Sequence, residues 1–143
     1  MDVSELRKRI IRALDDAGRD ASARRTVIDA ARAAYELFLN DIAVPAVRQA
    51  GAVLRAEGLQ CNVDTPAGSV RLSMPGTSTA FLEIELDTTA DEPQAIGRLS
   101  VPRGSGVLID ERPIAAGKPI AELTDEDLAA YLVSAIARLV VRS

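Results

Sequence analysis

Hydrophobic and polar residues follow two different periods along this chain. Between residues 4 and 57, apolar positions recur every three or four residues, which is the spacing of an amphipathic helix. After Gly58 they alternate singly with polar positions in short segments such as 59–64, 69–74 and 82–87, as in strands with one buried and one solvent-exposed face. The helical spacing returns after residue 124. This order predicts an α+β fold with N-terminal helices, an antiparallel sheet and a C-terminal helix packed on that sheet.

The first predicted helix spans residues 4–17. Ser4 is a suitable N-cap residue, and Gly18 interrupts the apolar pattern. The length of the chain fits a single domain, residues 1–143. Within it, residues 1–18 are a candidate oligomerisation or partner-binding arm. The apolar stripe of this helix consists of Leu6, Ile10, Ala13 and Ala17.

A second, longer helix is predicted from Asp20 to about Glu57, where Gly58 ends it. Pro45 lies inside this segment and cannot donate a hydrogen bond to the carbonyl of Asp41. The apolar period nevertheless continues beyond the proline. The pattern therefore leaves two alternatives open, a kinked helix or two abutting helices.

Short alternating segments between turn residues predict a meander of four to five antiparallel strands. Pro75 and Gly76 suit the centre of a type II turn. Connections of this length allow only antiparallel neighbours. The expected strands lie at about residues 59–63, 69–74, 79–88, 95–101 and 107–109.

Thr124 is expected to cap the final helix, which would cover the apolar face of the sheet. The first turn of this helix is acidic, and Arg138 and Arg142 lie near its end, which is the charge order that the helix dipole favours. Its apolar stripe consists of Leu128, Leu132, Ala135 and Leu139.

The central predicted strand contains the most concentrated carboxylates of the chain. Glu83, Glu85 and Asp87 project from its polar face. Arg71 and Arg98 are predicted on the same face of the neighbouring strands, so cross-strand ion pairs are expected. These five residues are also the candidate contact surface for another protein.

The same carboxylates support a second interpretation. Two of the residues Glu83, Glu85 and Asp87, with the loop carboxylate Asp91, could hold Mg²⁺ or Mn²⁺ in a metal-dependent hydrolase or nuclease. Pairing with arginine is the simpler interpretation. No catalytic residue, metal ligand or cofactor is therefore assigned.

Composition narrows the possible functions. The chain has no histidine, which excludes an imidazole base and a Ser-His-Asp triad. The single cysteine, Cys61, cannot form an intramolecular disulfide. A net charge of −4 gives no general attraction to nucleic acids or anionic membranes. No apolar run approaches about 18 residues, so the expectation is a cytoplasmic protein that binds neither nucleic acid nor membrane.

A non-catalytic protein-interaction module is the expected function. The usual catalytic residues are missing, and there are more amphipathic helices than one sheet face can cover, which favours a homodimer. In size, acidity and helix-flanked strands the chain resembles type III secretion chaperones, which implies a dimer that binds a segment of another protein. It departs from their pattern because residues 89–94 leave room only for a loop where those chaperones have a helix. Small-molecule binding between the sheet and the N-terminal helices is a further alternative.

Overall fold

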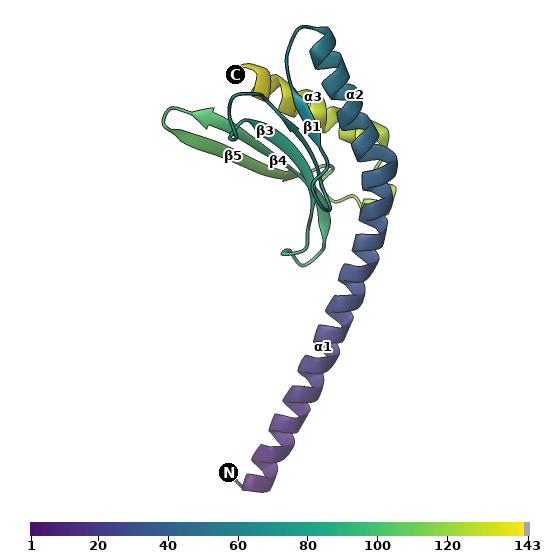
Figure 1. Ribbon diagram of the computed structural model, residues 1–143. Helices are drawn as coiled ribbons and strands as arrows, with labels where there is room; N and C mark the ends of the chain where they lie inside the picture. Colours follow the sequence, from purple (N-terminus) through teal and green to yellow (C-terminus); the bar gives the residue numbers. More distant parts are fainter. Residues whose placement is uncertain (142–143) are drawn as a thin grey trace.

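The computed structural model describes residues 1–141, in which a long helical region, a five-stranded sheet and a C-terminal helix follow one another (Figure 1). This confirms the predicted α+β class. The strand order is β1-β2-β3-β4-β5, and every neighbouring pair is antiparallel, so the predicted meander is also confirmed. The elements are α1 (Val3–Phe38), the π-helical turn η1 (Leu39–Ala43), α2 (Val44–Ala56), β1 (Asn62–Asp64), β2 (Val70–Ser73), β3 (Phe81–Asp87), β4 (Gln94–Arg103), β5 (Gly106–Pro113), the 3₁₀ turn η2 (Ile120–Glu122) and α3 (Asp125–Val141).

Helix α1 passes through Gly18 without interruption, so the prediction of a first helix that ends at residue 17 is wrong. A glycine inside a helix costs only about 1 kcal/mol relative to alanine. The neighbouring residues are mostly alanine, arginine and aspartate, and no proline lies among them. Asp2, rather than Ser4, caps the helix: its side chain accepts a hydrogen bond from the Ser4 N–H. Asp20 consequently lies within α1 and starts no new helix.

The helical path also continues through Pro45. In η1 the N–H of Val44 donates to the carbonyl of Leu39, five residues earlier, and this wider turn places Pro45 at the start of α2, where no N–H is needed. We call α1, η1 and α2 together the helical rod. The rod ends at Ala56, within one residue of the predicted Glu57, and Gly58 follows with a φ of 86°, which lets the Leu59 N–H donate to the carbonyl of Leu54.

Two strands, β1 and β5, differ from their predicted bounds by three residues or more at one end. β1 begins only at Asn62, because Leu59 completes the end of the rod and the Cys61 thiol lies 3.5 Å from the carbonyl of Gly51 in α2. β5 extends to Pro113 and pairs with β4 along its whole length, so residues 110–113 belong to the sheet.

Helix α3 covers one face of the sheet, as predicted. Thr124 and Asp127 form a capping box, in which each side chain accepts a hydrogen bond from the backbone N–H of the other. The predicted Arg142 lies outside the described residues. Buried residues of β2, β3 and α3 form the centre of the core: Leu72, Leu82, Ile84, Leu128 and Leu139.

The N-terminal part of α1 projects away from the rest of the molecule (Figure 1). Every residue from Met1 to Ala23 is exposed, and we call residues 1–23 the arm. Arg24 marks its end. The Arg24 guanidinium donates to the carbonyls of Thr88 and Ala90 at 2.7 and 2.6 Å, and also to that of Asp91. These bonds tie the helical rod to the loop between β3 and β4.

Gly97 in β4 is predicted to tolerate no side chain. A Cβ at this position would overlap the ring of Tyr131, which is buried against the sheet. Gly97→Ala should therefore lower the free energy of unfolding by about 2 kcal/mol, measured by urea denaturation. Gly18→Ala is the matched control, because a Cβ there meets nothing within 4 Å. It should increase the helical circular dichroism signal. An unaltered unfolding midpoint in Gly97→Ala would contradict the tight packing.

Candidate functional site

A row of alternating charges crosses all five strands of the sheet. Residues that lie opposite one another in antiparallel strands share a face, and Glu83 points away from the face of Leu82 and Ile84. We call this set the charged row. From β1 to β5 it consists of Asp64, Arg71, Glu83, Arg98 and Glu111.

Glu83 is the buried member of the row, with only 5% of its surface exposed. Arg71 binds its carboxylate at 2.9 Å, and the Ser69 hydroxyl lies 3.4 Å from it. The Arg71 guanidinium also lies over the Phe81 ring, 4.0 Å from its centre. Burial of this carboxylate is therefore balanced by a charge-assisted pair, which makes Glu83 a structural residue.

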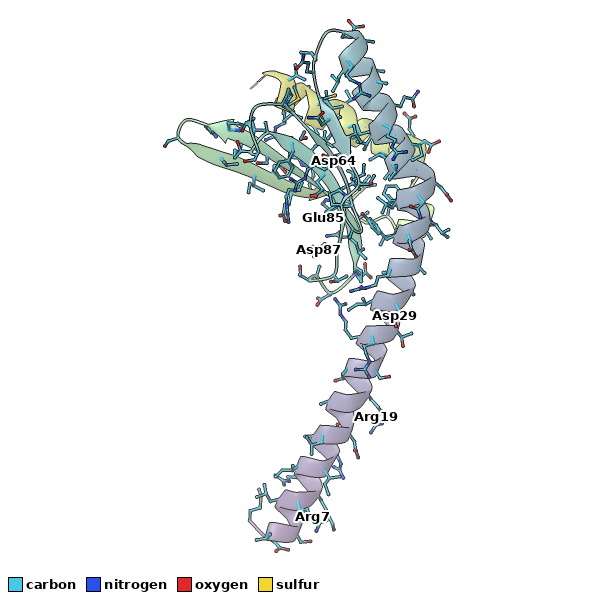
Figure 2. All side chains as sticks on the ribbon, viewed as in Figure 1. Arg7, Arg19, Asp29, Asp64, Glu85 and Asp87 are labelled. Atoms are coloured by element: carbon cyan, nitrogen blue, oxygen red, sulfur yellow. The ribbon has the colours of Figure 1, made fainter. Side chains whose placement is uncertain are left out.

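Arg98 joins the next two carboxylates. Its guanidinium lies 2.8 Å from Glu85 and 2.8 Å from Glu111. Burial raises the pKa of Glu85, although the charge of Arg98 opposes this shift. Asp87 lies further along the strand and accepts two hydrogen bonds from Thr89, which lower its pKa. Figure 2 shows Glu85 and Asp87 at the end of the sheet that faces the middle of α1.

The predicted cross-strand ion pairs are thus present. They determine whether the carboxylate oxygens are free to bind a metal ion. Arg71 and Arg98 lie close to the oxygen atoms that a metal ion would need. Among residues 1–141, no group of three histidine, cysteine or acidic residues is arranged to hold a metal. The loop residue Asp91 uses its backbone carbonyl to bind Arg24.

A cleft of about 1050 Å³ lies between the helical rod and the sheet. Tyr35 forms part of its wall, with its hydroxyl 2.9 Å from the carbonyl of Gly68 and 3.2 Å from that of Ile84. Burial, assisted by the nearby carboxylates, raises the pKa of Tyr35. The space could admit a small molecule, and that alternative stays a prediction. On the rod the cleft is lined by residues four positions apart: Arg32, Glu36, Asn40, Val44 and Arg48.

A second charged cluster lies on the α3 side of the sheet. Asp110 binds both Arg112 and Arg138 at 2.5 Å, and hydrogen bonds from these arginines lower its pKa to about 2. The Tyr131 hydroxyl is buried nearby and has no hydrogen-bond partner among the described residues. Burial raises the pKa of Tyr131 to about 12. Tyr131 is therefore neutral at physiological pH, and this cluster fixes α3 to the edge strand β5.

An apolar groove of about 710 Å³ lies between α2 and α3. Val53 and Val133 line it and are largely exposed. This groove was not predicted from the sequence, where only the stripe of α3 that faces the sheet was assigned a partner. A second apolar stripe on α3, with Val133 and Ile136 three residues apart, was the available signal.

The arm carries a further apolar surface. Its predicted stripe lies on a continuous helix, and the side chains of Leu6 and Ile10 are exposed by 47% and 49%. Val3 and Leu14 are more exposed still. Figure 2 shows Arg7 and Arg19 on the arm, far from the sheet. The arm is the longest part of the described chain that packs against no other element.

Comparison with protein-family models, curated proteins and solved structures gave no match. Within residues 1–141, no helix combines the length and apolar character needed to cross a membrane.

Glu83 and Glu85 are predicted to differ sharply in their importance for stability. Glu83→Ala should lower the free energy of unfolding by about 2 kcal/mol, because it leaves Arg71 and Ser69 beside an empty buried position. Glu85→Ala removes a more exposed pair and should cost less than about 1 kcal/mol. Urea denaturation of the two variants measures the difference. Equal losses would contradict the structural role given to Glu83.

Proposed function

We propose that this protein is a non-catalytic protein-interaction module that acts as a homodimer. The observation that carries the proposal is the arm. Its residues project beyond the sheet with an apolar stripe in solvent, and Leu6 and Ile10 are among the large exposed hydrophobic side chains. An isolated helix gains little stability from its own hydrogen bonds, and helices in proteins depend on burial of their apolar face. A second copy of the same stripe supplies that burial.

The chemistry of the sheet supports a binding role over a catalytic one. Arg71 pairs with Glu83 and Arg98 with Glu85, so two of the carboxylates that a hydrolase would need to keep free for a metal ion are already neutralised. The charged row instead gives the sheet an ordered pattern of paired charges, which favours selective contact with a complementary surface.

We further infer that this face of the sheet contacts another protein through Arg71, Glu83, Glu85, Asp87 and Arg98. Arg71 and the buried Glu83 would hold the surface in shape. Glu85, Asp87 and Arg98 are partly exposed and would make the contacts. With three acidic and two basic residues the surface is acidic, so it suits a basic partner.

The homodimer is tested by sedimentation velocity of the full chain at micromolar concentrations. The wild type should sediment as a dimer, and Leu6→Asp/Ile10→Asp as a monomer with unchanged strand content. Ile109→Asp is the matched control, because Ile109 is also an exposed apolar residue but lies on the edge strand β5. A wild type that remains monomeric at tens of micromolar would refute the dimer. If Ile109→Asp dissociated the dimer and the arm variant did not, the interface would lie at β5 and the arm would be excluded.

The second surface is tested by affinity capture from the lysate of the source organism. Wild-type protein should retain a partner that Glu85→Lys/Asp87→Lys loses, because the acidic contacts are reversed. The monomeric arm variant serves as a control for capture that depends on the dimer. A partner retained equally by the wild type and the sheet variant would count against this face.

A further inference from the structure

We infer that the arms of two copies pair antiparallel, with Leu6 of each copy against Ala17 of the other and Ile10 against Ala13. This inference rests on the proposed homodimer and adds its orientation, its register and the residues in contact. Two properties of the arm lead to it: the sizes of the stripe residues and the distribution of charge along the helix.

The stripe changes from large to small side chains along the arm. Leu6 and Ile10 lie in its N-terminal half, and Ala13 and Ala17 in its C-terminal half. Antiparallel pairing sets each large residue against a small one, so the two helices can interdigitate closely. Parallel pairing would set Leu6 on Leu6 and leave two layers of facing alanines underfilled. Cavities of that kind are destabilising.

The same register keeps the two folded bodies apart. When Leu6 lies opposite Ala17 of the second copy, Met1 lies opposite Ser22. The next residues after Ser22 reach Arg24, which is the point where the helical rod is tied to the loop between β3 and β4. Each sheet lies beyond an opposite end of the paired arms, so the two folded bodies do not collide.

Charge along the arm is separated into two blocks. The N-terminal block is basic, with Arg7, Lys8, Arg9 and Arg12, whereas residues 15–20 contain three aspartates and one arginine. Antiparallel pairing places each basic block beside the acidic block of the other copy. Parallel pairing would place basic beside basic.

Arg9 and Asp16 are expected to form ion pairs between the two copies at the edge of the contact. Arg9 directly precedes Ile10, and Asp16 directly precedes Ala17, so both flank the same side of the stripe. In an antiparallel pair these sides meet, and Arg9 of each copy comes close to Asp16 of the other. Their present partners within the chain are Glu5 and Arg19, at 3.4 and 3.3 Å, in exposed ion pairs that can rearrange at little cost.

The test is a charge exchange measured as the dimer Kd. Arg9→Asp and Asp16→Arg should each weaken the dimer by on the order of tenfold, because two pairs become repulsive contacts. The double variant Arg9→Asp/Asp16→Arg should return to within about threefold of the wild type. Lys8→Asp is the matched control. It reverses the same charge on the side of the helix away from the stripe and should leave the Kd within about threefold of the wild type.

The possible failures are distinguishable. Dimers weakened by both single variants and not restored by the double variant would refute the antiparallel register but leave the homodimer intact. A monomeric wild type would refute both proposals. Spin labels at Ser22→Cys, in a Cys61→Ala background, provide a measurement independent of affinity. Antiparallel arms separate the two labels by more than about 30 Å along the helix, whereas parallel arms place them at the same level. Labels at the same level would overturn the inference.

Discussion

Burial of Leu82 and Ile84 is the constraint on which the rest of this structure depends. Both side chains are completely buried in the core formed with α3 and the helical rod. Since successive residues of a strand point to opposite faces, this burial directs Glu83 and Glu85 to the other face. A shift of one residue in register would put the carboxylates into the core, so the apolar contacts fix the charged row as firmly as its own ion pairs do.

The helical rod divides its length between two environments. From Tyr35 onward its buried residues join the core, and Arg24 ties it to the loop between β3 and β4. Before Arg24 the same helix lies in solvent. The proposed function therefore assigns different roles to one continuous element: one part organises the fold, and the other provides a surface for association.

Local sequence patterns predicted the fold class, the meander, Thr124 as the cap of α3 and the face to which each residue of β3 points. They failed at Gly18, because a single glycine costs only about 1 kcal/mol in a helix and no proline lies near it to break the helix. The degree of burial of Glu83 also could not be predicted from the sequence. That property depends on the Ser69 hydroxyl and the Arg71 side chain converging on one carboxylate, and these groups come from β2 and from the residue that directly precedes it. The contact of Arg24 with three carbonyls left no signal in the sequence, since backbone acceptors are common to all residues.

The continuity of the helix gives the inferred dimer a fixed span. Because α1 runs without a break from the arm into the folded body, it would act as a helical spacer that holds the two sheets apart at a set distance. Two identical charged faces held in this way would bind a partner with two matching sites far more tightly than one face alone. This holds only if the distance between those sites equals the distance between the two sheets. Selectivity would then depend on the geometry of the partner assembly as well as on the contacts at each face.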